Sequence, residues 1–261
     1  MSVTPEQVEL LSLVVDEGRS QAASLPNGLP SAEVTMAAYA AAGGGDDLPL
    51  PVTAACLCVY LGADVLDNVI DRELSDRWEE HGAHQALLAG VTVLTPLSIA
   101  CLGELNGPIE RRLAAQRILI DTLITMAAGE VADVAFEGRD DVSLDACEAM
   151  VLAKSGAECS LFAQVGAIVA GAPSDVCDAY ATFGRELGAA IQLVSDCADL
   201  ATGDEGRDLV SGKRTLPIVH ALTVLPDAKR AELRDHLAAS DDDERRRAAR
   251  QMLLDAGSFH F

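Results

Sequence analysis

The chain has 261 residues, 49% of them hydrophobic and 23% charged, so it is long and apolar enough to fold around a sizeable core. A formal net charge of −22 excludes nucleic-acid binding by bulk attraction, because an acidic surface repels a phosphate backbone. The seven cysteines are scattered and form no CxxC pair, so neither a disulfide framework nor a zinc site is predicted.

The spacing of apolar residues predicts helices along the whole chain. Thr4-Pro5-Glu6-Gln7 is typical of a helix start, with a capping threonine, a proline in the first position and a glutamine three residues after the threonine. Residues 27–30 and 43–51 are breaks, and residues 201–214 are predicted to form a loop. Further helices are predicted over residues 52–75, 85–105, 108–137, from Ser143, from Pro173 to about Leu200, over 216–224, over 226–239 and in the polar tail.

These elements predict an all-α protein, a single domain over residues 1–261 built as a bundle of about ten helices. The apolar stretches 48–63 and 85–103 are long, but they contain prolines or threonines and lack basic flanks, which favours buried helices over membrane spans. The first residues do not resemble a signal peptide. A cytoplasmic protein without a membrane span is therefore expected.

The first candidate for chemistry is an acidic helix face formed by Asp64, Asp67 and Asp71. Helical positions advance by about 100° per residue, so these side chains point the same way. Two carboxylates one turn apart suit Mg²⁺, which takes oxygen ligands and keeps several waters. Taken alone the pattern is weak, because a chain with 41 acidic residues also forms solvated acidic faces.

A second acidic face follows later in the chain, where Gln192, Asp196 and Asp199 share one side of a helix. It is followed by a glycine-rich loop that carries cations. An acidic face beside cations is typical of a diphosphate site, since metal ions and basic side chains together neutralise phosphate oxygens. The alternative for the loop lysine is a solvated charge beside a helix. The basic residues concerned are Lys154, which opens a Lys-Ser-Gly-Ala turn, and Arg207 and Lys213 in the loop.

Residues 187–217, LGAAIQLVSDCADLATGDEGRDLVSGKRTLP, resemble the second aspartate-rich region of the trans-isoprenyl diphosphate synthases, or polyprenyl synthetases. Residues 66–73, LDNVIDRE, resemble the first such region, and Gly129-Glu130-Val-Ala-Asp133 and Lys154-Ser155 resemble two shorter motifs of that family. The resemblance covers residues ~50–220. It implies a divergent member of the class I isoprenoid synthases, with helices around a deep apolar cavity and both aspartate regions facing each other at its mouth.

The resemblance also implies a reaction and its residues. An allylic prenyl diphosphate, farnesyl or geranylgeranyl diphosphate, would ionise with the help of about three Mg²⁺ ions (Mn²⁺ as an alternative), and the prenyl cation would pass to an acceptor. A homodimer is expected. By resemblance, the catalytic residues are Asp67, Asp71, Lys154, Asp196 and Lys213; the metal ligands are Asp67, Asn68, Asp71, Asp196 and Asp199; and the substrate-binding residues are Gly62, Ala63, Arg77, Lys154, Gln192, Arg207 and Lys213.

Gly62 and Ala63 are included among the substrate-binding residues because their side chains are small. They precede Asp67 by about one helical turn, where the family has bulky residues at the floor of the prenyl cavity. Small residues there predict an open floor and a long prenyl chain. The alternative is close helix–helix packing through a Gly-Ala patch.

The chain departs from the family at several positions. Asn68 and Ser195 stand where the family has aspartates. Residues 24–30 hold no cation where the family has GGKRxRP, Tyr60 replaces a histidine, and Asp76-Arg77 replaces a pair of arginines. These losses predict that the acceptor, which the sequence does not identify, is not isopentenyl diphosphate.

Three alternatives to prenyl transfer remain open. One is a terpene cyclase that uses the same diphosphate with no second substrate, although only 3% of the residues are aromatic and aromatic rings stabilise cyclising cations. The others are a degenerate, non-catalytic subunit of an enzyme and a module that carries a prenyl lipid without chemistry.

Overall fold

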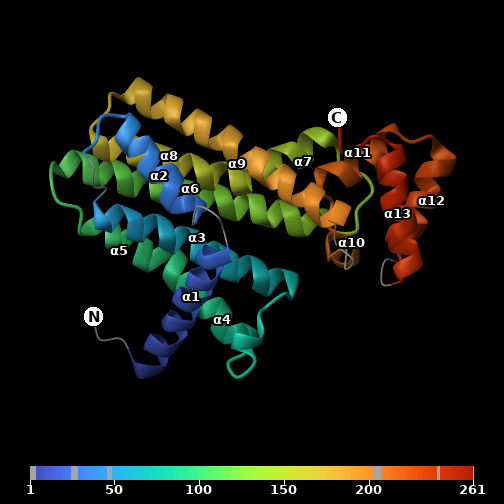
Figure 1. Ribbon diagram of the computed structural model, residues 1–261, viewed down its shortest axis with the longest axis horizontal. Helices are drawn as coiled ribbons and strands as arrows, with labels where there is room; N and C mark the ends of the chain where they lie inside the picture. Colours follow the sequence, from blue (N-terminus) through green and yellow to red (C-terminus); the bar gives the residue numbers. More distant parts are fainter. Residues whose placement is uncertain (1–3, 25–28, 46–48, 203–206, 240–241, 261) are drawn as a thin grey trace. The chain divides into compact units, whose positions relative to one another are not determined.

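The computed structural model describes residues 4–24, 29–45, 49–202, 207–239 and 242–260. These residues form thirteen α-helices and no β-strand, so the predicted all-α fold is confirmed (Figure 1). The helices are α1 (Pro5–Ser24), α2 (Pro30–Ala41), α3 (Leu50–Asp71), α4 (Ala83–Thr92), α5 (Ser98–Gly103), α6 (Ile109–Phe136), α7 (Leu144–Val151), α8 (Ala157–Ala170), α9 (Ser174–Thr202), α10 (Arg207–Ser211), α11 (Leu216–Val224), α12 (Asp227–Leu237) and α13 (Asp243–Asp255).

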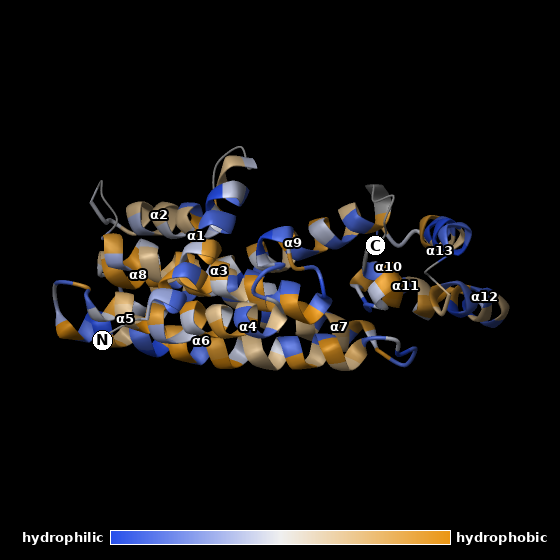
Figure 2. Ribbon diagram, turned by 90° about the horizontal axis from the view of Figure 1, so that it is seen from below, coloured by the Kyte–Doolittle hydropathy of each residue, from blue (hydrophilic) through white to orange (hydrophobic). Residues whose placement is uncertain are grey.

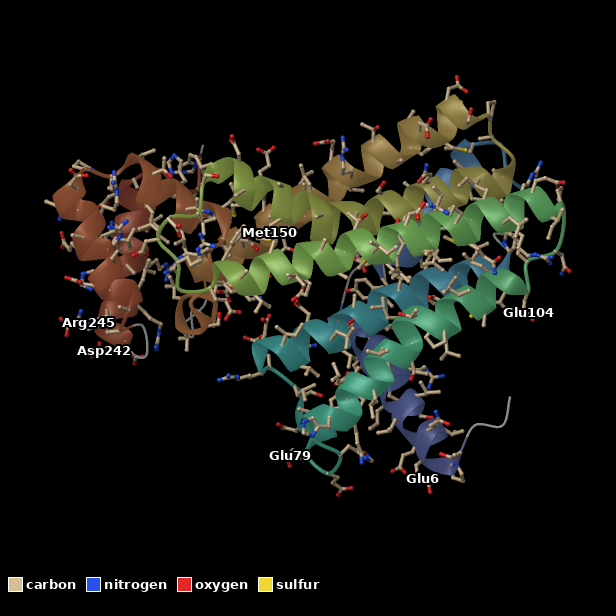
Figure 3. All side chains as sticks on the ribbon, turned by 180° about the vertical axis from the view of Figure 1, so that it is seen from behind. Glu6, Glu79, Glu104, Met150, Asp242 and Arg245 are labelled. Atoms are coloured by element: carbon tan, nitrogen blue, oxygen red, sulfur yellow. The ribbon has the colours of Figure 1, made fainter. Side chains whose placement is uncertain are left out.

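Side-chain caps fix where several helices begin. Thr4 and Gln7 bond reciprocally, each backbone N–H donating to the other's side-chain oxygen, as the sequence predicts for the start of α1. Ser143 caps α7 by accepting from the N–H of Ala146 at 3.1 Å. Asp242, labelled in Figure 3 with Arg245, caps α13 by accepting from the N–H groups of residues 244 and 245.

Three features differ from the prediction. Helix α3 ends at Asp71 rather than at residue 75, because Arg72 adopts the left-handed conformation with φ of 62° and closes the helix. Within the predicted loop 201–214, residues Arg207–Ser211 form α10. The helix predicted over 85–105 contains a π-helical segment, Val93–Leu97, between α4 and α5; Pro96 lies in this segment and cannot donate a backbone hydrogen bond.

The chain forms two compact units, each discontinuous in sequence. Unit 1 comprises Met1–Leu123 and Glu158–Gly184, and unit 2 comprises Ile124–Ala157 and Arg185–Phe261. The chain therefore passes from one unit to the other within α6, at the start of α8 and again within α9. The single domain expected over residues 1–261 stays a prediction.

Unit 1 is built on α3, which lies beside α4 and α5 and is also contacted by α1 and α2 (Figure 1). Its core gathers Val14 of α1, Val65 of α3 and Ala86 of α4 around Trp78. The indole of Trp78 is buried, and its N–H donates to Glu17 of α1 at 3.0 Å. This bond satisfies the one polar atom of a large buried ring.

Unit 2 has two hydrophobic clusters. The first joins α7 and α11 to the C-terminal parts of α6 and α9, and it includes Cys147, Val219 and Met150, which Figure 3 labels on α7. The second joins α11 to α12 and α13 through Ile218, Leu233 and Leu253. Hydrophilic residues predominate in α12 and α13 (Figure 2), and the few apolar residues of these helices supply their part of this cluster.

Two helical stretches, Leu50–Asp71 and Ala83–Gly103, are long and apolar enough to cross a membrane by length and composition. Such a measure is weak evidence for a span, because a core helix of a soluble protein meets it equally well. Both stretches pack against each other within unit 1. The cytoplasmic location stays a prediction.

Candidate active site

Asp196 is the centre of the candidate site in unit 2. It lies on α9 with only 6% of its surface exposed. Gln192, one turn earlier, donates its amide N–H to Asp196 Oδ1 at 2.7 Å, and Ser155 donates its hydroxyl to the amide oxygen of Gln192 at 2.5 Å. Because its oxygen is engaged by Ser155, the Gln192 amide must turn its NH₂ group to the carboxylate. Ser155 and Gln192 therefore hold Asp196 in one orientation.

The charges around Asp196 oppose one another. Burial raises the pKa of its carboxyl to about 6, and the negative charge of Asp133 acts in the same direction. The Gln192 hydrogen bond and the positive charges of Lys213 and Lys154 lower the same pKa. Two lysines predicted from the sequence thus act on the same carboxyl. The structure brings Lys154, Lys213, Gln192 and Asp196 together.

Lys154 is held by two carboxylates of α6. Its ammonium lies 2.8 Å from Glu130 Oε2 and 2.9 Å from Asp133 Oδ2. Lys154 itself belongs to a π-helical segment, Leu152–Gly156, which lies between α7 and α8. Such segments are frequent at functional sites because they redirect side chains within a helix.

Gly129 allows this arrangement. A Cβ atom at this position would lie 2.8 Å from the backbone nitrogen of Lys154 and 2.9 Å from the carbonyl carbon of Ala153. Only a glycine lets α6 approach the π-helical segment so closely. The close approach places Glu130, the next residue, within ion-pair distance of Lys154.

Asp199 and Arg207 lie further along α9 and in α10. One carboxylate oxygen of Asp199 accepts from the backbone N–H of Asp208 at 3.1 Å, and this bond ties the end of α9 to the first turn of α10. Arg207 begins α10, and its side chain lies outside the described residues, as do residues 203–206. Its role in substrate binding stays a prediction.

The candidate site in unit 1 lies at the end of α3. Asp64 Oδ2 accepts from the Gln21 side chain of α1 at 2.8 Å and from the amide nitrogen of Asn68 at 3.3 Å. Burial raises the pKa of the Asp64 carboxyl. Asn68 thus uses its amide nitrogen for Asp64, so its amide oxygen is the atom suited to a metal ion. Asp67 and Asp71 follow on the same partly buried stretch.

Besides Asn68, two further positions where the sequence departs from the family that it resembles lie in unit 1. Tyr60, one turn before Asp64, is half-buried, and burial together with Asp64 and Glu158 raises the pKa of its phenol to about 12. Arg77 lies in the 3₁₀ turn Asp76–Trp78 and donates to the Ser20 hydroxyl of α1 at 2.8 Å. Residues 25–28 of the segment without cations lie outside the described residues.

Gly62 requires a correction. A Cβ atom there would lie 2.5 Å from the backbone nitrogen and 2.7 Å from the Cα atom of Leu94. Gly62 therefore faces the π-helical segment between α4 and α5, and it has no open space beside it. The expectation of an open cavity floor at Gly62 is wrong, and the packing alternative describes this position. Ala63 is partly buried, and its role stays a prediction.

The sequence does not predict the role of two residues of the site in unit 2. Glu130 and Asp133 belong to a motif that resembles one of the family, and in the structure both pair directly with Lys154. Their spacing of three residues, which places both on one helix face, was the signal available. The partner, Lys154, is 21 residues further along the chain than Asp133.

The donor atoms of both sites suit Mg²⁺. Within the described residues, no three His, Cys, Asp or Glu side chains form a group that could hold a metal ion. Mg²⁺ needs only one or two carboxylates when water and substrate phosphates supply the other oxygens. Asp67 and Asp71 on α3, and the buried Asp196 with Asp199 on α9, offer carboxylates of this kind in each unit.

Comparison with known proteins gives a consistent result. The sequence model described as polyprenyl synthetase matches residues 64–253. A (2E,6E)-farnesyl diphosphate synthase of Mycobacterium tuberculosis is 34% identical over 196 residues, which cover 71% of this chain and 54% of the relative. A geranylgeranyl diphosphate synthase of the same organism is 31% identical over 239 residues, which cover 85% of this chain and 64% of the relative. The crystal structure of a polyprenyl synthetase from Streptomyces coelicolor A3(2) superimposes with a TM-score of 0.78 at 26% identity, covering 89% of this chain and 73% of the other.

The all-helical fold, which superimposes on this polyprenyl synthetase, is of the isoprenoid synthase type. The chain belongs to the polyprenyl synthetase family. It spans a little over half the length of the farnesyl diphosphate synthase that it matches.

Proposed function

We propose that this protein is a Mg²⁺-dependent prenyltransferase that ionises an allylic prenyl diphosphate and transfers the prenyl group. The observation that supports this proposal most is the buried carboxylate of Asp196. Gln192 and Ser155 hold it in one orientation, and the positive charges of Lys154 and Lys213 lower its pKa. If Asp196 served only to stabilise the fold through an ion pair, the hydrogen bonds from Ser155 to Gln192 and from Gln192 to Asp196 would not be needed to orient its carboxylate. Membership of the polyprenyl synthetase family supports the same reaction class.

In the proposed reaction, the bond between prenyl C1 and the diphosphate oxygen breaks, and both electrons leave with the diphosphate. Asp67 and Asp71 in unit 1, and Asp196 in unit 2, are each proposed as ligands of Mg²⁺, which when bound would stabilise the negative charge of the leaving group. Lys154 and Lys213 neutralise further phosphate charge. The allylic cation then takes an electron pair from the acceptor, which afterwards loses a proton.

The acceptor is proposed to be a molecule other than isopentenyl diphosphate. Arg77 is the one remaining cation of the expected arginine pair, and its guanidinium already contacts Ser20. A second diphosphate without cationic partners would be repelled by the acidic chain, at a cost of a few kcal/mol per close charge pair at an effective dielectric of about 20. The second candidate is chain elongation with isopentenyl diphosphate, which the printed names of the relatives favour.

A single incubation series tests this proposal. The protein is mixed with Mg²⁺ and with geranyl, farnesyl or geranylgeranyl diphosphate, each with and without isopentenyl diphosphate, and products are measured by mass spectrometry. We expect release of inorganic diphosphate that stops when EDTA removes the metal, and little elongated product. Release that is unaffected by EDTA would contradict the metal-dependent mechanism.

The other outcomes separate the alternatives. Efficient formation of a longer prenyl diphosphate would establish elongation and overturn the prediction about the acceptor. A hydrocarbon or alcohol formed from one substrate alone would establish a cyclase. If no prenyl diphosphate is consumed under any condition, the protein is a non-catalytic subunit or a carrier.

We also propose that the protein is a homodimer that uses α6. This helix exposes six large apolar side chains at spacings of three, four or seven residues: Ile109, Leu113, Ile120, Ile124, Val131 and Val134. Figure 2 shows orange residues recurring along α6. An apolar stripe of this length along one helix is typical of a helix–helix interface with a second copy.

Light scattering coupled to gel filtration tests the homodimer. The wild-type chain should have twice the mass of one chain, and Ile124→Asp combined with Val131→Asp should reduce it to that of a monomer. Val224→Asp, at an exposed apolar residue of α11, is the matched control and should leave the mass unchanged. A monomeric wild-type protein at micromolar concentration would contradict the proposal.

A further inference from the structure

Arg214 has an unusual environment in unit 2. Its side chain is only 5% exposed. The guanidinium donates to three backbone carbonyls, those of Arg139, Gly212 and Lys213, with the last two at 2.9 and 3.3 Å. Its remaining nitrogen lies 3.5 Å from a carboxylate oxygen of Asp140, which also pairs with Arg234 at 3.1 Å. The guanidinium therefore joins the segment after α6 to the segment after α10.

These contacts fix the backbone on both sides of Lys213. The Lys213 N–H donates to the carbonyl of Asp208 at 3.0 Å, while the Lys213 carbonyl accepts from Arg214. The carbonyl of Gly212 accepts from the N–H of Gly138 at 2.9 Å as well as from Arg214. Lys213 thus has a fixed backbone, although its side chain is long and flexible.

A thiol holds the backbone of Arg214, the residue that follows Lys213. Cys147 of α7 donates its S–H to the carbonyl of Arg214 at 3.1 Å. Burial, followed by the charges of Asp196 and Asp133, raises the pKa of the Cys147 thiol to about 12, so the thiol stays protonated and can donate. The segment 212–214 is therefore held from α7 as well as from the segment after α6.

We propose that Arg214 is a positioning residue, which holds the backbone of Lys213 so that the Lys213 ammonium reaches the diphosphate beside Asp196. This inference rests on the proposed function. Asp208, whose carbonyl accepts from the Lys213 N–H, donates its own N–H to the carboxylate of Asp199, three residues after Asp196 on α9, so a displaced backbone would move a charge that lies beside the site. Lysine is a poor substitute for Arg214, because one ammonium cannot reproduce the planar fork that binds three carbonyls.

The alternative role of Arg214 is stability alone, and a double-mutant cycle distinguishes the two. The probe is inorganic diphosphate with Mg²⁺, and its dissociation constant is measured by calorimetry for the wild type, Arg214→Lys, Lys213→Ala and the double variant. We expect each single change to weaken binding about tenfold, which corresponds to about 1.4 kcal/mol. The double variant should be no weaker than Lys213→Ala, because Arg214 acts through Lys213.

Matched controls separate positioning from folding. Arg139→Lys changes a side chain that pairs with Asp141 at the surface and keeps the carbonyl that Arg214 binds, so diphosphate binding should be unchanged. If Arg214→Lys does not fold, as judged by its thermal transition, Asp140→Asn serves instead, because it removes only the carboxylate partner of the guanidinium. Asp140→Asn should weaken binding severalfold, and Arg234→Gln, which removes the other partner of Asp140, should not.

The outcomes distinguish a failure of this inference from a failure of the proposed function. The inference is overturned if Lys213→Ala weakens diphosphate binding but Arg214→Lys does not. It is also overturned if Arg214→Lys weakens binding by the same factor in the double variant as in the wild type, because Arg214 then does not act through Lys213. The same holds if Asp140→Asn has no effect when it is the variant used. If the wild type does not bind diphosphate, or if Lys213→Ala binds it as well as the wild type, the diphosphate site itself is wrong.

Discussion

Replacing Asp196 with alanine should lower the rate of diphosphate release by about three orders of magnitude or more, since charge-stabilising groups at a reaction centre contribute on that scale. Asp196 is buried, and its carboxylate accepts from Gln192, whose amide oxygen in turn accepts from Ser155, so alanine would remove a carboxylate that is held in one orientation. The measurement is the release of inorganic diphosphate from farnesyl or geranylgeranyl diphosphate at saturating Mg²⁺. Asp67→Ala should cause a loss of similar size, because Asp67 is the proposed metal ligand on α3.

Asp178→Ala is the matched control. Asp178 lies on the same helix, α9, but its side chain is exposed, and it precedes Asp196 by 18 residues, or about five helical turns. This variant should retain the wild-type rate, and all three variants should keep the wild-type thermal transition. An Asp196→Ala variant that is folded and fully active would show that the candidate site is not the active site.

Replacing Gly62 with phenylalanine should destabilise the fold strongly. The new Cβ atom alone would lie 2.5 Å from the backbone nitrogen of Leu94, so α3 would have to move away from α4 and α5. Overpacking of a well-packed core costs about 1–3 kcal/mol, and here the obstacle is backbone rather than a flexible side chain. The thermal transition should fall by several degrees. The rates with geranyl, farnesyl and geranylgeranyl diphosphate should fall together.

Gly45→Phe is the control for this prediction, because no described atom lies within 4 Å of a Cβ at that position. Its thermal transition should match that of the wild type. The sequence also allowed a different result for Gly62→Phe. In that case the variant would keep its stability, and the phenylalanine would limit the length of the prenyl chain that fits into the cavity. A stable Gly62→Phe variant with a shifted preference for short substrates would show that the packing between α3 and Leu94 does not decide this position.

The positions of most helix ends could be predicted because they depend on neighbouring residues. The reciprocal bonds of Thr4 and Gln7, and the cap at Ser143, involve residues three apart in sequence. The end of α3 could not be predicted in this way. Arg72 adopts a left-handed conformation that non-glycine residues seldom adopt, and no local sequence signal indicates it.

The all-α fold could be predicted from the spacing of apolar residues, and the family from motifs spread over residues ~50–220. The two acidic helix faces follow from spacing within single helices, and Lys154 and Lys213 were candidates because of the motifs that contain them. Which of these groups lie side by side could not be read from the sequence. The hydrogen bond from Ser155 to Gln192 joins residues 37 apart, and that from Arg214 to the carbonyl of Arg139 joins residues 75 apart. The space beside Gly62 likewise depends on Leu94, 32 positions further along the chain. Such contacts depend on how closely helices approach, which is set by packing across each unit and not by the pattern of any single helix.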